Sequence, residues 1–371
     1  MPQIHAVRRE RAQQKIADLG ADAALITSLP NVRYLTGMVS SNAALLLPAD
    51  GRAVLATDSR YEEAARRDCT DLDLVIDRVI EPALATLAAD RGAAVLAFEA
   101  QEMTVERHNE LASLAGGPAL LVPLGRVVEE LRMVKDEDEI ALLARACAIT
   151  GEAFEAVLPQ VTAGRTEREF AVLLERAMID LGAEALAFDT IVASGPNGAI
   201  PHHVPGDRAF AAGDLITVDC GARYGGYHAD MTRTVALGEP AAWQREIYEI
   251  VATAQRAGVA AATVGTDVRT VDAAARDLIA DAGYGGDFGH GLGHGVGLEV
   301  HEAPTIGYGR TGTLGDRVPV TVEPGIYLSG RGGVRIEDTL VVRGSARADA
   351  DAGAAGSHQM LTTTTRDLLV L

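Results

Sequence analysis

The chain has 371 residues, with 33 Lys and Arg against 52 Asp and Glu, so its formal net charge is −19. Its length predicts two or three domains, and 48% hydrophobic with 23% charged residues is typical of a globular protein with large cores. An acidic chain repels phosphate backbones, so we expect no nucleic-acid partner. The longest apolar runs, such as residues 43–47, are far shorter than the roughly 20 residues of a membrane span, so we expect no membrane partner either.

The three cysteines (Cys69, Cys147 and Cys220) are widely spaced and odd in number. This excludes a disulfide framework and favours a reducing compartment. The first fifteen residues contain no apolar stretch after their charges, so no secretory signal is expected. Together these features predict a cytoplasmic location.

The first third of the chain alternates between helical and strand patterns. The expected elements are a helix at 7–19 ended by Gly20, a strand at 23–27, a break at Pro30-Asn31, strands at 43–47 and 53–56, a helix at 60–67, a strand at 74–76, a helix at 82–90 and a strand at 94–98. Such an alternation is typical of a layered α/β domain, which we assign to residues 1–125.

Residues 126–135 are expected to be a linker, and residues 136–371 a second domain of mixed α and β structure. This domain begins with helices at 136–158 and 167–181, the second preceded by a Thr166–Glu169 capping box. After Gly182 we expect short strands in a glycine-rich segment that holds six of the nine histidines. Residues 345–358 are expected to be a low-complexity linker or mobile loop before a terminal strand at 368–371.

Two aspartates stand where buried strands are expected. Asp219 follows the apolar run 215–218, and a buried acid needs a partner or a metal. Asp230 lies on the return strand after the turn Gly225-Gly226. If the hairpin is centred near these glycines, both carboxylates lie on one face of the sheet, whereas a slip of one residue would separate them.

Glu323 and Glu337 repeat the pattern, since each follows an apolar β-branched run, and His294 lies between glycines. Any one of these acids alone is readily explained as a strand-end or salt-bridge residue. Four carboxylates on one buried surface would repel, and two divalent cations would neutralise them. Oxygen ligands with one histidine suit Mn²⁺, Co²⁺, Fe²⁺ or Zn²⁺, and such a pair can hold a bridging hydroxide that hydrolyses an amide.

The contexts of these residues resemble those of the pita-bread metallopeptidases, which include aminopeptidase P, prolidase, methionine aminopeptidase and creatinase. The segments that carry the resemblance are SGPNGAIPHH (194–203), ITVDCGARYGGYHADMTRT (216–234), GHGLGHGVGLEVHE (289–302), TVEPGIY (321–327) and GVRIEDT (333–339). The resemblance implies a creatinase/prolidase-like N-terminal α/β domain and an α+β pita-bread catalytic domain. It also implies two divalent metal ions per chain, with manganese favoured. The implied ligands are Asp219, Asp230, His294, Glu323 and Glu337.

Further roles follow from the same resemblance. The implied catalytic residues are His202, His301 and Glu323, and the implied substrate-binding residues are His290, Arg335 and Tyr227. His301 would stabilise the tetrahedral intermediate, Glu323 would shuttle a proton, and His290 would line the proline side of the pocket. Arg335 either binds the end of the substrate or holds an acid in a salt bridge, and Tyr227 either contacts a metal ligand or only packs.

Within this family, the N-terminal domain, with NVRYLTG (31–37) and TDSRY (57–61), argues against a methionine aminopeptidase. The complete ligand set argues against creatinase, which does not use it. We therefore expect a homodimeric Xaa-Pro aminopeptidase that acts on proline-containing peptides. The alternatives are an Xaa-Pro dipeptidase, a hydrolase or lyase of non-peptide substrates, and a binding module without activity.

Overall fold

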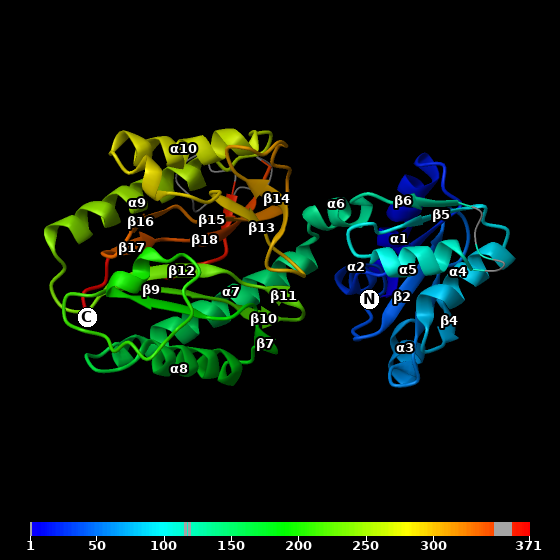
Figure 1. The fold of residues 1–371 in the computed structure, drawn as a ribbon, viewed down its shortest axis with the longest axis horizontal. Coiled ribbons are helices and arrows are strands. Elements are labelled where there is room, and N and C mark those ends of the chain that lie inside the picture. The colour runs from blue at the N-terminus through cyan, green and yellow to red at the C-terminus, as the bar shows by residue number, and fades with distance from the viewer. Residues whose placement is uncertain (1, 115–116, 118–119, 345–357) are drawn as a thin grey trace. The chain divides into compact units, whose positions relative to one another are not determined.

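A computed structural model describes residues 2–114, 117, 120–344 and 358–371 (Figure 1). The chain forms two compact units, Met1–Arg132 and Met133–Leu371. The division falls within the segment 126–135 that was expected to be a linker. Most of that segment is a helix, α6 (Val127–Met133), so the connection has regular structure.

The first unit is built on one sheet with the strand order β4-β3-β2-β1-β5-β6. Its elements are α1 (Pro2–Asp18), β1 (Ala23–Ile26), α2 (Leu29–Thr36), β2 (Ala43–Pro48), β3 (Val54–Thr57), α3 (Glu62–Asp68), β4 (Asp73–Ile76), α4 (Ile80–Asp90), β5 (Val95–Phe98), α5 (Val105–Ala112) and β6 (Leu120–Pro123). The expected α/β layering is confirmed. The break expected at Pro30-Asn31 is wrong, because Pro30 lies in the first turn of α2, where a missing N–H costs nothing. Helix α5 and strand β6 were not foreseen.

The second unit contains the segments that carry the predicted metal ligands. Its elements are α7 (Glu137–Val157), α8 (Glu167–Asp180), β7 (Ala185–Leu186), β8 (Ile191–Ser194), β9 (Leu215–Cys220), β10 (Ala222–Tyr224), β11 (Tyr227–His228), β12 (Met231–Ala236), α9 (Ala242–Ala261), α10 (Val268–Asp281), β13 (Gly293–Gly295), β14 (Glu302–Ile306), β15 (Val318–Val322), β16 (Gly325–Leu328), β17 (Gly332–Arg335), β18 (Asp338–Val342) and β19 (His358–Met360), with short 3₁₀ turns at Leu158–Gln160, Gly195–Ala199 and Gly285–Asp287.

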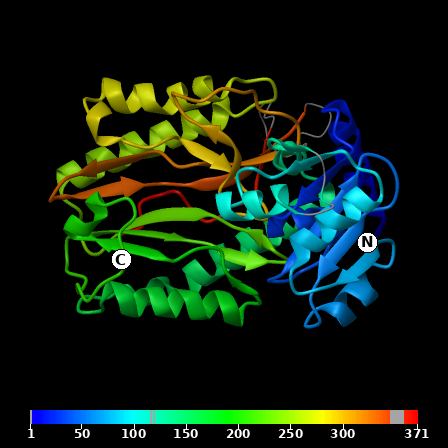
Figure 2. The ribbon, with the colours of Figure 1, turned by 45° about the vertical axis from the view of Figure 1, so that its right-hand side comes forward.

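Two helix-covered sheets face each other in this unit (Figures 1 and 2). Helices α7 and α8 pack on the sheet β12-β9-β8 through an apolar core that includes Phe154 and Phe170. Helices α9 and α10 pack on the sheet β14-β13-β15-β18-β19 through a second core that includes Val251 and Val271. The strands therefore lie between two helical layers, and the expected α+β pita-bread architecture is confirmed.

The predicted helices α7 and α8 both begin with a capping box, Asp136 with Glu139 and Thr166 with Glu169. The long helices α9 and α10 were not expected. Residues 345–357 lie outside the described part of the chain, and residue 358 begins β19. The expected terminal strand is only a short parallel bridge between Val370 and Ala236.

All three cysteines are free and buried. Among the described residues, no helix combines the length and the hydropathy that a membrane crossing requires.

Candidate active site

The two aspartates lie on one face of a long hairpin. The turn residues Gly225 and Gly226 have φ values of 57° and 86°, as a two-residue hairpin turn of the primed type requires. Pairing from this turn places Asp219 directly opposite Thr232. Asp230 precedes Thr232 by two residues and therefore points to the same face. This is the register that a hairpin centred on the two glycines predicts.

The two glutamates come from the facing sheet. Glu323 follows β15 and Glu337 precedes β18, and Val322 pairs with Asp338 in that strand pair. The two glutamates are therefore the next residues along the same ladder, at the end of the sheet that meets the hairpin. Carboxylate oxygens of Asp219, Asp230 and Glu337 all lie within 4.8 Å of one another.

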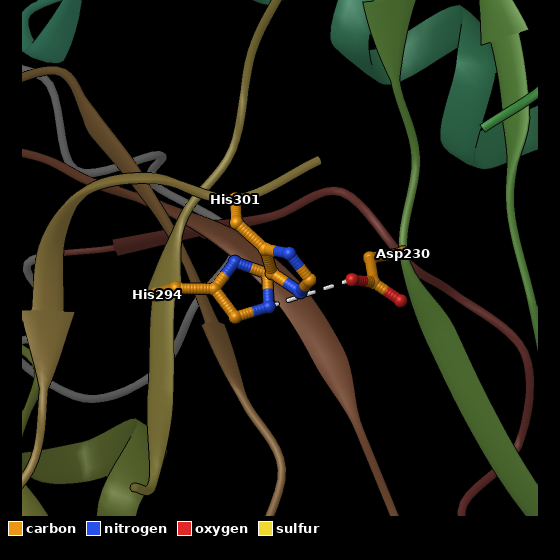
Figure 3. Close-up of side chains that lie close together, drawn as sticks. All are labelled: Asp230, His294 and His301. Atoms are coloured by element: carbon orange, nitrogen blue, oxygen red, sulfur yellow. Dashed lines mark ion pairs between the residues drawn. The ribbon is translucent and has the colours of Figure 1, made fainter. Parts of the chain in front are cut away.

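His294, on β13, completes the cluster (Figure 3). Its Nδ1 lies 3.0 Å from the carbonyl oxygen of Gly295, which accepts a hydrogen bond and so leaves the lone pair on Nε2. That Nε2 lies 3.5 Å from Asp230 Oδ2 and 3.5 Å from Glu323 Oε1. Burial lowers the pKa of His294 to about 4, so the ring is neutral at neutral pH, as a metal ligand must be.

These side chains fit divalent cations. Burial raises the pKa values of Asp230 and Glu323 well above their ordinary range, with the carboxylate of Glu337 adding to the shift in both. Burial and the Asp219 charge raise the pKa of Glu337 to about 8. Asp219 Oδ1 and Glu337 Oε1 are buried and accept no hydrogen bond. Buried carboxylate oxygens without a donor are the arrangement that a cation would complete.

A cavity of about 320 Å³ opens onto the cluster. It is lined by Phe188, Pro201, His202, Asp219, Asp230, His290, Gly291, Gly293, His294, Val300, His301, Thr305, Glu323, Arg335 and Glu337. All five predicted ligands thus share one cavity with four of the other predicted site residues.

Arg335 connects the carboxylates to His290. Its Nη2 donates to Asp219 Oδ2 at 2.6 Å, and its Nη1 donates to the Tyr327 hydroxyl at 3.0 Å. Because arginine only donates, the tyrosine proton points to His290 Nε2, 2.9 Å away. Burial lowers the pKa of His290 to about 4, so this ring is neutral and its Nδ1 donates to the Gly291 carbonyl. Arg335 therefore holds an acid of the cluster, and both nitrogens of His290 are engaged.

His301 lies beside His294 rather than across the cluster from it. The two ring centroids are 4.4 Å apart with an interplanar angle of 81°, and both rings face Asp230 (Figure 3). The segment between them is a series of bends that lets β13 pair antiparallel with β14. His301 and His202 are both exposed at the cavity wall.

Tyr227 is not among the residues that line the cavity. Its side chain is buried and its hydroxyl donates to Glu139 Oε1 of α7 at 2.8 Å. His228 is also buried and bonds the carbonyl of Gly297. His203 bonds Glu167 of α8. The structure thus places Tyr227 as a link between α7 and the hairpin rather than beside the cluster.

Several residues that form hydrogen bonds with the predicted ligands were not predicted from the sequence. Thr232 donates to Glu337 Oε2 at 2.7 Å and accepts from Arg335 Nε at 3.0 Å. Arg233 donates to the backbone oxygen of Glu337 and pairs with the fully buried Asp338. Strand alternation from Asp230 already puts Thr232 on the cluster face, so its role was readable from the sequence. The Arg233–Asp338 pair joins distant segments and was not.

A second cavity of about 410 Å³ lies next to the first. Residues of α8, the start of β8 and the segment 202–205 line it, and His202 lines both cavities. The side chain of His202 therefore forms part of the wall between them.

Two protein-family profiles match the chain. The profile of metallopeptidase family M24 matches residues 141–344, and that of the creatinase/prolidase N-terminal domain matches residues 8–134. The chain is 44% identical over 243 residues to an Xaa-Pro dipeptidase of Pyrococcus furiosus. The aligned region covers 66% of this chain and 67% of the dipeptidase.

Two solved structures show the same fold over nearly the whole chain. An Xaa-Pro dipeptidase from Bacillus anthracis superposes with a TM-score of 0.92 at 35% identity, covering 99% of this chain and 100% of that one. An X-Pro aminopeptidase from Thermotoga maritima superposes with a TM-score of 0.87 at 36% identity, covering 98% and 99%.

Proposed function

Since the chain belongs to metallopeptidase family M24 and carries the creatinase/prolidase N-terminal domain, we propose that it hydrolyses Xaa-Pro dipeptides. The observation that carries the proposal is the set of four carboxylates and one neutral imidazole that line one cavity, in which two buried carboxylate oxygens accept no hydrogen bond. The dipeptidase relatives at 44% and 35% identity favour a dipeptide substrate over the aminopeptidase activity that was first expected.

Asp219, Asp230, His294, Glu323 and Glu337 would hold two divalent ions, with manganese the favoured metal. When bound, such ions lower the pKa of a coordinated water and polarise the scissile carbonyl. Arg335 and Thr232 fix the orientations of Asp219 and Glu337, respectively, through the hydrogen bonds described above. The protein would thereby keep the ligand oxygens in place without rearrangement during turnover.

The remaining polar groups of the cavity act on the substrate itself. His202 and His301 supply ring N–H groups that can donate to negative charge as it develops on the carbonyl oxygen. Cleavage before proline leaves a secondary amine that must take up a proton. We assign this transfer to Glu323, whose carboxylate would take a proton from the attacking water and pass it to the amine. Phe188, Pro201 and Val300 give the cavity apolar walls that suit a pyrrolidine ring.

One observation favours an Xaa-Pro aminopeptidase as a second candidate. Of the described residues that line the first cavity, Arg335 alone carries a permanent positive charge, and it is bound to Asp219. The carboxylate of a dipeptide would need a cationic partner there, whereas a longer peptide has an amide at that position. The second cavity, beyond His202, offers room for such an extension.

The test is turnover of Ala-Pro against Ala-Pro-Ala by chelator-treated protein reloaded with Mn²⁺, with Ala-Ala as the control substrate. The proposal predicts the highest kcat/KM for Ala-Pro and little hydrolysis of Ala-Ala. Higher kcat/KM for Ala-Pro-Ala would establish the second candidate instead. Equal hydrolysis of Ala-Ala, or no hydrolysis of either proline substrate, would contradict both.

A further inference from the structure

Both ends of the segment that carries His202 form hydrogen bonds with a single buried carboxylate. We define the His202 loop as residues 194–206, which leave β8 and include the 3₁₀ turn Gly195–Ala199. Glu167, the first residue of α8, is fully buried beneath this loop. Its carboxylate takes no part in the cluster described above.

Both ends of the loop donate to Glu167. At the first end, Oε1 accepts from the Ser194 amide at 2.8 Å, from the Ser194 hydroxyl at 2.7 Å and from Asn197 Nδ2 at 2.9 Å. At the second end, Oε2 accepts from His203 Nε2 at 2.8 Å and from the Gly206 amide at 3.2 Å. One side chain thus ties the beginning of the loop to its end.

The five hydrogen bonds keep this buried carboxylate charged. Burial acts to raise the pKa of Glu167, but the hydrogen bonds from Asn197, His203 and Ser194 hold it below its ordinary value. The group is therefore ionised at neutral pH and accepts at both oxygens. Because a carboxylate cannot donate, His203 must carry its proton on Nε2.

The loop held in this way reaches the active site. Pro201 and His202 both line the first cavity, and the Pro201 carbonyl lies 3.4 Å from Arg335 Nη1. Gly198 lies against β17, where an added Cβ would come within 3.1 Å of the Gly333 amide nitrogen. The loop is thus confined on one side by β17 and on the other by Glu167.

We propose that Glu167 is a positioning residue that fixes the His202 loop, so that His202 meets the substrate in its productive orientation. This inference rests on the proposed function, because it assigns His202 a role in turnover. The physical reason is that a loop fixed at both ends loses little orientational freedom when substrate binds.

The substitution Glu167→Gln affects the two ends of the loop differently. If the amide oxygen stays at the Oε1 position, it still accepts from Ser194 and Asn197. The amide nitrogen then faces the Gly206 N–H, which loses its acceptor, and His203 can pair with it only after its own proton moves to Nδ1 so that Nε2 accepts. The variant therefore releases Gly206 at the second end of the loop, while it keeps the size and the buried environment of the side chain.

The experiment is a double-mutant cycle of Glu167→Gln with His202→Ala, measured as kcat/KM on the preferred Xaa-Pro substrate. We expect Glu167→Gln to lower kcat/KM by about 10- to 100-fold, as misplacement of a catalytic group does. In the double variant the loss should stay within about twofold of that in His202→Ala alone. Independent multiplication of the two losses, or wild-type kcat/KM in either single variant, would overturn the proposal.

Amide hydrogen exchange, measured without substrate, keeps the positioning claim separate from the proposed function. Glu167→Gln should speed exchange at Gly206 and leave Ser194 protected; equal protection of Gly206 in both proteins would overturn the proposal even if the wild type hydrolysed no Xaa-Pro substrate. Glu169→Ala is the matched control, because it removes one of the two hydrogen bonds of the α8 capping box and none of the bonds to the loop. It should lower Tm with unchanged kcat. If Glu167→Gln does not fold, His203→Ala removes one contact from the same end and should show the same exchange change.

Discussion

Removal of the metal ions should make the stability of the second unit fall as pH rises. In the metal-free protein burial and Asp219 raise the pKa of Glu337 from 4.5 to about 8. The folded state then holds this proton more tightly than the unfolded chain does. The resulting stabilisation is fully present below about pH 4.5 and is lost as pH rises through about 8. Asp230 and Glu323, whose pKa values are also raised, act in the same direction.

The expected size follows from the same values. A pKa difference of one pH unit corresponds to about 1.4 kcal/mol, so the change at Glu337 corresponds to a loss on the order of 5 kcal/mol in the free energy of unfolding between acidic and alkaline pH. Bound cations replace these protons and abolish the loss. A metal at 100 times its Kd adds about 2.7 kcal/mol per site.

The sole tryptophan makes the measurement specific to the second unit. Trp243 lies in α9 and packs against the core of that unit. Its fluorescence during urea unfolding therefore reports on that unit. Chelated and Mn²⁺-loaded protein would be compared from pH 5.5 to 8.5.

The chelated protein should lose stability as the pH rises across this range, and the loaded protein should not. Glu337→Gln is the control, because a neutral side chain removes the raised pKa of Glu337 and should make the slope of the chelated protein shallower. Chelated protein whose stability is constant, or increases with pH, would refute the electrostatic reasoning.

Three further outcomes are expected. Thr232→Val should lower kcat several-fold and weaken metal affinity, measured by metal titration, because Glu337 and Arg335 each lose a hydrogen bond; unchanged affinity would show that Thr232 does not orient the ligand. His301→Ala should lower kcat by about 10²–10³ with metal content and Tm intact; a lower Tm at constant kcat would instead indicate a packing role. Light scattering at micromolar concentration should find a homodimer, and a fully active monomer would speak against that expectation.

The sequence predicted the cluster better than it predicted the fold around it. The glycine pair 225–226 sets the register that puts Asp219 and Asp230 on one face, and local turn geometry of this kind is written in a few adjacent residues. The Thr166–Glu169 capping box of α8 is a local signal of the same kind. Features that depend on neighbouring residues alone were therefore predicted well.

The elements and contacts that the sequence did not predict depend on residues that are far apart in the chain. Helix α9 carries Ile247 and Val251 at helical spacing, but α9 and α10 together lie between glycine-rich strand segments that dominate the local pattern. Tyr227 was expected to bind the substrate, whereas its hydroxyl donates a hydrogen bond to Glu139, which lies 88 positions away in the chain. The Glu167 contacts likewise join α8 to residues 27 to 39 positions later. Such pairings depend on tertiary packing, which no local motif encodes.

We propose that the five clustered ligands hold two divalent ions on which Xaa-Pro hydrolysis depends. The most direct test is a titration of chelated protein with Mn²⁺, followed by the rate of Ala-Pro hydrolysis, in the wild type and in Asp230→Asn. The account predicts that wild-type activity is absent without metal and saturates at two equivalents per chain, and that the variant stays nearly inactive throughout. Full activity of the chelated protein, or near-normal turnover by Asp230→Asn, would contradict it.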